Sequence, residues 1–600
     1  MKKIILISLL GAFMIGCSAT DRRLTDSENG PDSSGGAEAT NYLTFHLVSP
    51  ITRAEISGDY QDGTERENYV KMVRFFFFDD EGIAAPVWKK KGTGGYESFV
   101  DWYPTAEDIG EGDKDMTVEK IVNATLGINT PLTMEHPGLV LAVINPNRAV
   151  MTLGSTFTND DDVTVTGPSL EEVRAAVADF YTGQAGATDD DNFVMSNSVF
   201  VNDGDIVDVT VLDKENNFFM TIDEAKTNPI IMFVERVLAR IDLAIEMTPA
   251  NTVDGTPIYS VNDDPYQVDG KDEQIYVRLL GWNVTGTPNR SRLVKNVSPE
   301  WADNLFGKMY PWNAAVLHRS FWAVNPPAEE FEYQFGTLFG PANSEAGNFC
   351  PANAQAIPEA GNTTTAYLHE NAAESAEFGG EAVASPTQVI IAAQLVYENG
   401  EPFPLAEWEY KKYTLYSLKN LLANEILQYL YKKTVTDTKT TFVKITPDDI
   451  DFKTASQYGE ADPDDIGNYY VYAVLAEEAE EYTWTLGNEA DSPVFSIAQV
   501  NKYIHDRVNR VMIWNNGLTY YYFEIRHLAD IGLPGYYGVV RNHLYYASLT
   551  SLTGLGTPVY DPDNEVIYPE KPEYDESIVS AEVKILQWRL VRQDYELKWQ

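Results

Sequence analysis

The chain is poor in cysteine, in histidine and in positive charge, and each shortage narrows what it can be. Its 600 residues include only Cys17 and Cys350, so no disulfide framework is expected, and stability has to come from burial and sheet hydrogen bonds. The seven histidines are scattered without the spacing of metal ligands. With 44 basic and 90 acidic residues the formal net charge is −46, which repels phosphate backbones and argues against nucleic acid as a partner.

The sequence also lacks the motifs that organise catalysis. It contains no H-E-x-x-H, no P-loop, no G-x-S-x-G and no cysteine cluster. The glycine-rich residues 92–95 predict a turn. The acidic runs 160–162 and 189–191 could offer oxygen ligands to calcium, but they lack the spacing of a calcium loop, so solvated loops are the favoured interpretation and calcium binding stays open. We therefore expect no enzyme, no metal site and no cofactor.

What the chain does have begins at its N-terminus. Lys2 and Lys3 make the first residues basic, and residues 4–15 form an apolar run that is too short to span a bilayer stably. Gly16 and Cys17 follow, then a polar stretch, an order that resembles a bacterial lipobox with Met14 in the place of the usual leucine. We predict a lipoprotein signal peptide over residues 1–17 and lipidation at Cys17 (palmitate included), which would anchor the precursor in the outer membrane by lipid alone. A plain cleaved signal is the alternative.

The length and the aromatic content favour several β-rich domains. Six hundred residues are too many for one hydrophobic core, and the 12% of aromatic residues, mostly tyrosine and phenylalanine, favour strands. Apolar residues predict strands over 42–48, 69–78, 139–144 and 231–247. The last of these has a second face that carries arginine and acidic residues. We place a domain boundary just before it, at residue 230.

Helices are few in the predicted pattern. A capping box at Ser169 predicts a helix in which Val173, Val177 and Phe180 share one face. A second helix is predicted over residues 418–433, and a third from Ser496 towards Val511. Isolated helices among many strands indicate sheets with helical insertions.

The first predicted strand is followed closely by a candidate processing site. Strand 42–48 ends before Arg53, and the polar stretch that follows Ala54 is the kind of exposed segment in which proteases cut most readily. Arg66 and Arg74 are also available, but Arg74 lies inside a predicted strand and should be protected. Residues 21–41, in front of the strand, have the composition of a flexible tether.

The end of the chain carries another strand pattern, with only a short tail after it. The stretch before it, residues 561–575, is polar and contains three prolines, so it could project the strand outward. We expect a bulge at residues 585–586, after which the apolar face continues. That face consists of Val579, Ala581, Val583, Ile585, Leu586, Trp588 and Leu590. The residues alone leave open whether the strand serves another molecule or folds back as a hairpin within its own domain.

Short strings of residues occur in a fixed order through most of the chain. They are FVMSN at 193–197, VERVLAR at 234–240, HRSFWA at 318–323, YLHEN at 367–371, TQVI at 387–390, WNNG at 514–517, GVVRNH at 538–543 and LTGLGTP at 552–558. Together these strings resemble the fimbrillins of Bacteroidales, the minor-fimbrium major subunits of donor-strand-assembled type V pili. Residues 281–379 fit the resemblance least.

The resemblance implies a mainly β fold of two transthyretin-like β-sandwich domains with a few inserted helices. The expected segments are 1–17 (signal peptide), 18–53 (tether and removable first strand), 54–229 (N-terminal domain), 230–576 (C-terminal domain with long insertions) and 577–600 (donor strand). The function implied is that of a structural fimbrial subunit that supports adhesion.

The same resemblance implies a route of assembly. The lipoprotein export machinery would deliver the precursor to the outer membrane, and a trypsin-like protease would cut between Arg53 and Ala54. This cut removes the first strand and leaves a groove for the C-terminal strand of an identical or related subunit in an extracellular fimbrium. Receptors on host or bacterial surfaces would be further partners.

Two other functions remain open at this point. One is a surface glycan-binding lipoprotein, because eleven tryptophans could stack on sugar rings. Its helical starch-binding form would need tandem helix pairs, which the sequence does not show. The other is an anchor or accessory pilin that keeps its lipid.

Overall fold

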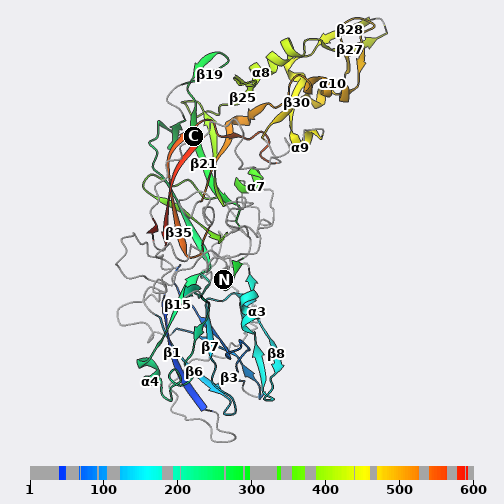
Figure 1. Ribbon diagram of the computed structural model, residues 1–600. Helices are drawn as coiled ribbons and strands as arrows, with labels where there is room; N and C mark the ends of the chain where they lie inside the picture. Colours follow the sequence, from blue (N-terminus) through cyan, green and yellow to red (C-terminus); the bar gives the residue numbers. More distant parts are fainter. Residues whose placement is uncertain are drawn as a thin grey trace, which may run out of the picture. The chain divides into compact units, whose positions relative to one another are not determined.

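The computed structural model describes a defined part of the chain in two compact units, and many of their elements are labelled in Figure 1. The described residues are 39–48, 67, 69–90, 94–104, 122–178, 193–202, 205–261, 265–287, 291–296, 334–339, 354–371, 387–437, 439–459, 469–525, 539–563, 578–587 and 590–591. The N-terminal unit contains those up to residue 48, from Tyr69 to Val173 and from Val209 to Phe233. The C-terminal unit contains residue 67, those from Arg174 to Asp208 and those from Val234 onwards.

The N-terminal unit holds its first strand between two others. β1 (Ala39–Val48) pairs antiparallel with β6 (Val122–Thr130) and parallel with the first residues of β15 (Ile230–Arg236). The pairing with β6 runs from Ala39 opposite Thr130 to Leu47 opposite Val122. The predicted strand over residues 42–48 is therefore confirmed, and it lies in the interior of a sheet.

The remaining strands of this unit surround a run of phenylalanines. β2 pairs with β5 and β7, and β14 extends the sheet beyond β7. All six residues of β2 are buried, Arg74 included, so the strand is covered on both faces. The elements are β2 (Val73–Phe78), β3 (Trp88–Lys89), β4 (Tyr96–Glu97), β5 (Phe99–Trp102), β7 (Leu139–Ile144), α2 (Arg148–Met151), β8 (Ser155–Thr158), β9 (Thr164–Gly167), α3 (Leu170–Ala175), β14 (Thr210–Val211) and α4 (Ile222–Thr227).

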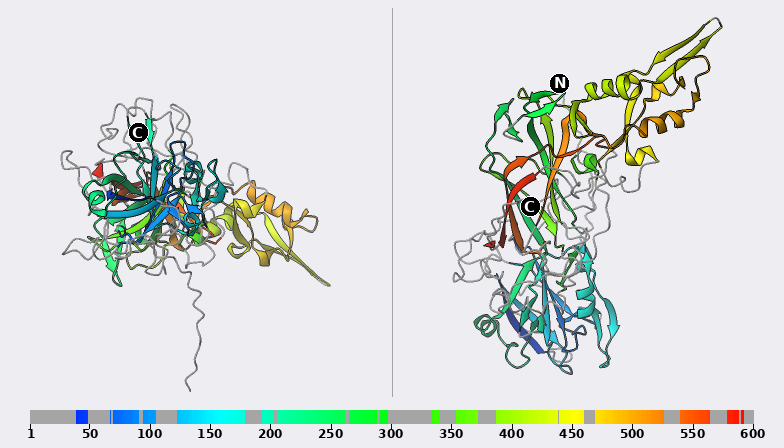
Figure 2. Two further views of the ribbon diagram at one scale, coloured as in Figure 1. Left: turned by 90° about the horizontal axis from the view of Figure 1, so that it is seen from below. Right: turned by 45° about the horizontal axis from the view of Figure 1, so that its top comes forward.

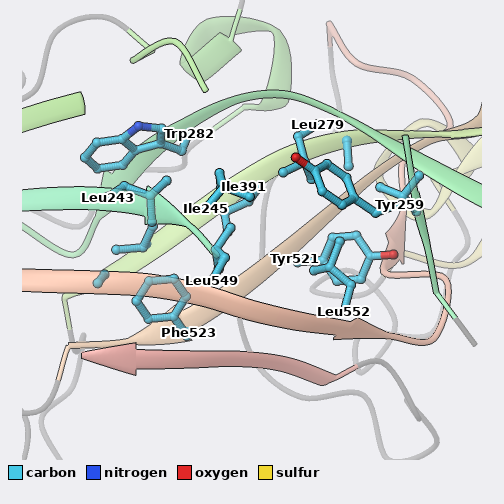
Figure 3. Packing of buried hydrophobic residues seen from close by; sticks show 14 of the residues in the cluster. Leu243, Ile245, Tyr259, Leu279, Trp282, Ile391, Tyr521, Phe523, Leu549 and Leu552 are labelled. Carbon is cyan, nitrogen blue, oxygen red and sulfur yellow. The ribbon is translucent and has the colours of Figure 1, made fainter. Parts of the chain in front are cut away.

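The C-terminal unit is built around a β-sandwich. One sheet contains, in order, β23 (Thr363–His369), β16 (Leu238–Ile245), β35 (His543–Thr553), β37 (Ile578–Gln587) and β38 (Leu590–Val591). The other contains β17 (Asn251–Val253), β18 (Thr256–Ser260), β21 (Tyr276–Thr285), β24 (Gln388–Val396), β34 (Leu518–Glu524) and β36 (Thr557–Pro558). Figure 3 shows Leu243 and Leu549 of the first sheet facing Trp282, Ile391 and Phe523 of the second.

An insertion between β26 and β33 has a hydrophobic core of its own, with Trp484 fully buried in it. Figure 2 shows its elements, coloured from olive to gold, gathered together. They are α8 (Leu415–Leu421), a π-helical turn (Leu422–Ile426), β27 (Leu430–Thr436), β28 (Lys439–Lys444), a 3-10 turn (Pro447–Asp449), β29 (Ile450–Thr454), α9 (Ala455–Tyr458), β30 (Val471–Leu475), a 3-10 turn (Glu477–Ala479), β31 (Thr483–Leu486), β32 (Val494–Phe495) and α10 (Ile497–His505).

Short elements complete the C-terminal unit. They are β10 (Val177–Ala178), β11 (Met195–Asn197), β12 (Phe200–Asn202), β13 (Asp205–Val207), β19 (Tyr266–Val268), β20 (Lys271–Glu273), β22 (Ser291–Arg292), α7 (Phe335–Phe339), β25 (Leu405–Trp408), β26 (Lys411–Thr414), β33 (Met512–Trp514) and a 3-10 turn (Asn515–Gly517). The described residues are therefore mainly β, as the sequence predicts.

The predicted strand 69–78 begins only at Val73, and the helix predicted from Ser496 towards Val511 ends at His505. Three further predictions were also wrong in extent. The helix opened by the Ser169 capping box ends at Ala175, and Val177 starts β10 against β22. The predicted helix 418–433 ends in the π-helical turn at Ile426, and the β-branched residues after it belong to β27. The predicted strand 231–247 divides at Val237 into β15 and β16. In each case a pairing with a distant strand decided the outcome.

Candidate functional site

The candidate site is the slot that β1 occupies in the N-terminal unit. Leu43, Phe45 and Leu47, which alternate along β1, have no solvent exposure. Thr44, on the opposite face, is also buried, and its hydroxyl lies 3.0 Å from that of Thr125 in β6. β1 is thus covered on both faces and hydrogen-bonded along both edges.

Two further contacts fasten the strand. The ring of Phe45 stacks on that of Phe75 in β2, with centroids 4.9 Å apart and planes at 23°. The backbone N–H of Tyr42 donates to the carbonyl of Phe219 at 2.8 Å, and the N–H of Phe219 donates back at 3.1 Å. Phe219 lies just before α4, so residues beyond the sheet also contact β1.

The energetics follow from this burial. Burying a large apolar side chain contributes about 1.5–3 kcal/mol, so Leu43, Phe45 and Leu47 together contribute roughly 5–9 kcal/mol. A unit without β1 would have an apolar groove between β6 and β15 and unpaired backbone groups on both strands. Such open edges are templates for pairing with another chain.

The C-terminal strand lies elsewhere. β37 pairs antiparallel with β35 from Ile578 opposite Thr553 to Gln587 opposite His543, and β38 pairs with β37. In a single chain this segment therefore forms a hairpin at the edge of its own sandwich, which is the alternative that the residues left open. The edge of β35 is the pairing surface that an isolated molecule offers to it.

The expected bulge at residues 585–586 was wrong. The pairing of β37 is continuous there, and the shift in register lies in its partner β35, between Leu549 and Ser551. Among the predicted donor residues, Val579, Ala581, Val583, Ile585 and Leu586 lie in β37, and Leu590 begins β38. Trp588 lies outside the described residues.

The other predicted sites divide between the described and undescribed parts of the chain. Cys17, Arg53, Ala54 and the acidic run 189–191 lie outside the described residues. Within them, residues 160–162 form a turn in which Asn159 Oδ1 accepts hydrogen bonds from the backbone. The described residues contain no cluster of three or more metal-ligating side chains. None of their helices has the length and apolarity of a membrane span.

Arg74 lies inside β2, as predicted, and is held there. It is 4% exposed, and its guanidinium donates to both carboxylate oxygens of Asp101, at 2.6 and 2.8 Å. It also donates to the carbonyl of Met151 at 2.9 Å. A protease cannot reach this arginine while the sheet is intact.

Sequence reasoning missed a cluster of buried charges in the C-terminal unit. Lys295 Nζ lies 3.5 Å from Glu235 Oε1, and Arg541 donates to Glu370, with every one of these side chains at most 1% exposed. Burial raises the pKa of Glu235 to about 7, although the positive charges of Lys295 and Arg541 oppose the shift. The alternation along 231–247 predicted a polar face with Arg236, Arg240 and Asp242, but it places Glu235 among the apolar positions and so gave no sign of this cluster.

Several of these buried groups belong to the strings that carry the family resemblance. String 234–240 supplies Glu235, string 367–371 supplies Glu370 and string 538–543 supplies Arg541. Arg541 also donates to the carbonyls of Leu293 and Arg292, at 3.1 and 2.8 Å. The strings thus meet around one buried polar centre, because charges without water must find partners in a fixed arrangement.

The family comparison concerns the same part of the chain. Residues 512–594, which include β34, β35 and β37, match the family model for the C-terminal part of fimbrillin, the major fimbrial subunit protein type IV. This stretch is therefore similar to the C-terminal region of fimbrillins. Fimbrillins are structural subunits of extracellular cell-surface appendages and not enzymes. The sequence-based assignment to the fimbrial class is therefore confirmed.

The chain was also compared with solved structures, and those that match it have low sequence identity. A candidate cell adhesion protein from Parabacteroides distasonis is 12% identical, with 93% of this chain and 99% of that chain covered and a TM-score of 0.33. The C-terminally truncated tip fimbrial protein Mfa3 from Porphyromonas gingivalis is 12% identical, with coverages of 91% and 99% and a TM-score of 0.29. No curated protein sequence matches the chain. The fimbrillin assignment rests on residues 512–594.

Proposed function

We propose that this fimbrillin-type chain is exported as a lipoprotein precursor, loses β1 by cleavage after Arg53, and polymerises by donor-strand exchange into an adhesive fimbrium. The observation that supports this proposal is the position of β1, which is buried on both faces and paired on both edges. A cut at Arg53 would fall five residues after its end. Loss of this strand would leave a unit that needs a replacement from outside.

The proposed donor fits the groove in length and pattern. β37 and β1 both contain ten residues. Val579, Ala581, Val583 and Ile585 alternate along β37 as Leu43, Phe45 and Leu47 alternate along β1. A strand of this length can therefore replace the ladder and supply apolar side chains at the same spacing.

We expect β37 to be more stable in the vacated groove of a neighbour than in its own unit. Within its own chain β37 has a long ladder only with β35, whereas in the vacated slot of a neighbour it would pair with both β6 and β15. The four alternating apolar side chains with their backbone hydrogen bonds would contribute on the order of 10 kcal/mol before the cost of ordering the strand. The added ladder and the two-sided burial favour the groove of a neighbour.

Assembly can be tested on the purified precursor with an arginine-specific protease. We expect cleavage after Arg53 to produce a ladder of SDS-resistant oligomers. Deletion of residues 577–600 should leave the cleavage intact and abolish the ladder. Ladders that persist without the tail would show that the donor is another segment.

N-terminal sequencing of material from the cell surface separates a shaft subunit from an anchor. Chains that begin at Ala54 are expected for the shaft. Chains that retain residues 17–53 would identify a lipid-bearing anchor or accessory pilin instead. The receptor of the assembled fimbrium would then be sought among surface molecules of host or bacterial cells.

A further inference from the structure

Glu67 is a buried acid that lies in the sequence just downstream of the candidate processing sites. Its side chain has no solvent exposure, and it belongs to the C-terminal unit. In the sequence it directly follows Arg66 and lies fourteen positions after Arg53. A carboxylate withdrawn from water is strongly destabilising unless it is paired, so its partners decide how firmly the chain is held at this point.

The partners hold both the side chain and the backbone of Glu67. Arg240 Nη1 donates to the two carboxylate oxygens at 3.0 and 3.1 Å. The Tyr367 hydroxyl donates to Oε1 at 2.6 Å, and Arg236 Nε donates to the Glu67 carbonyl at 3.0 Å. We call Glu67 with Arg236, Arg240 and Tyr367 the Glu67 latch. The three partners of Glu67 come from β15, β16 and β23.

The latch is fixed by a second row of contacts. Arg240 also donates to both carboxylate oxygens of Asp242, at 2.8 and 2.7 Å, and Asp242 accepts from the Thr365 hydroxyl at 2.6 Å. Burial would lower the pKa of Arg240, but the hydrogen bond and charge of Asp242 and the charge of Glu67 raise it. Burial and the Glu67 carboxylate raise the pKa of Tyr367, so its hydroxyl keeps its proton and remains a donor.

We propose that the Glu67 latch sets the downstream limit of N-terminal processing. An endoprotease binds several residues on each side of the bond that it cuts, in an extended conformation. Glu67 is one of the two residues of the Arg66–Glu67 bond, and it cannot enter a protease while its carboxylate and carbonyl are both held inside the sandwich. The latch therefore protects this bond and leaves Arg53 as the site of cutting.

The inference rests on the proposed function, because it concerns which arginine the processing protease uses. It assigns to Glu67 an influence on which bond is cut, although Glu67 is not part of the cleavage site at Arg53. Whatever is removed upstream, the chain from residue 67 onwards stays attached to the C-terminal unit.

Digestion of the full precursor with an arginine-specific endoprotease tests the latch, with N-terminal sequencing of the products over time. For the natural chain we expect a product that begins at Ala54 and none that begins at position 67. Glu67→Ala should raise the rate of cutting after Arg66 at least tenfold. Tyr367→Phe removes one hydroxyl and keeps the shape of the ring, so it should raise that rate several-fold.

Tyr545→Phe is the matched control. Tyr545 is a fully buried tyrosine of the same unit, and its hydroxyl accepts a hydrogen bond from the Val540 N–H at 2.9 Å, outside the latch. This variant loosens the unit without releasing Glu67, so the bond after Arg66 should stay as resistant as in the natural chain. If Glu67→Ala fails to fold, the test compares the rate of cutting after Arg66 in Tyr367→Phe with that in the natural chain.

Three results would overturn the latch. They are rapid cutting after Arg66 in the natural chain, no acceleration in either latch variant, and equal acceleration in Tyr545→Phe. Failure of the proposed function looks different. If the precursor resists cutting after Arg66 but forms no ladder, strand exchange is refuted and the latch is not. If ladders form from chains that begin at position 67, the latch is refuted and strand exchange is not.

Discussion

Replacing Phe45 by alanine distinguishes a strand that is discarded from one that is kept. Phe45 is wholly buried in β1, and its ring stacks on Phe75. Truncating a buried phenylalanine costs about 3–5 kcal/mol, in which the loss of the ring pair accounts for about 0.5–1.5 kcal/mol. Since a folded domain is stable by only about 5–15 kcal/mol, the precursor should lose a large part of the stability of its N-terminal unit.

The same substitution should have no effect once β1 has been removed. Assembled subunits prepared from Phe45→Ala should match those from the natural chain, because the altered residue has left with the propeptide. Phe75→Ala is the control, because Phe75 lies in β2 and stays in the mature chain. It should destabilise the precursor and the assembled form alike.

Hydrogen exchange of peptides from β2 and β7, followed across a urea series, reports on the N-terminal unit in both forms. The expected pattern is a lower urea midpoint for Phe45→Ala in the precursor only. If assembled Phe45→Ala material is destabilised as much as the precursor, β1 is still in place and strand exchange is refuted. If the precursor itself is unaffected, the packing of Phe45 described above is wrong.

Three further predictions concern parts of the molecule that processing leaves in place. Burial, with the positive charge of Arg541 second, lowers the pKa of His369 to about 3, so below about pH 6.5 the unfolded chain binds a proton that the folded chain refuses. Between pH 7 and pH 5 the natural chain should therefore lose about 2 kcal/mol more than His369→Gln in urea unfolding. Burial raises the pKa of Glu235 to about 7, so its stabilising contribution grows as the pH falls through that value, and it cancels in the comparison of the two chains. Asp101→Asn should cost about 3–5 kcal/mol in urea unfolding of the N-terminal unit, since it leaves the buried Arg74 without its charged partner; a loss below about 1 kcal/mol would contradict the buried pair. Ser496→Ala removes the capping box of α10, in which the Ser496 hydroxyl accepts from the Gln499 N–H at 3.3 Å, and should lower stability by about 1 kcal/mol, whereas an unchanged urea midpoint would contradict the role of the cap.

The sequence alone determined what depends on neighbouring residues. Apolar runs located β1 and β7, and capping boxes located the starts of α3 and α10, because strand periodicity and end capping act within a few residues. The strings at 514–517, 538–543 and 552–558 also fall within residues 512–594, which match the family model for the C-terminal part of fimbrillin.

Only the tertiary structure decided what depends on distant partners. Residues 427–433 are helical by periodicity, yet Leu430 to Lys433 pair with β31, which begins fifty residues later. Glu67 and Arg240 are 173 positions apart, so no local pattern shows that the acid is buried and held. The place of β37 is the clearest case: its residues predict a strand, but a strand pairs with whichever open edge is available, and in a single chain that edge belongs to β35.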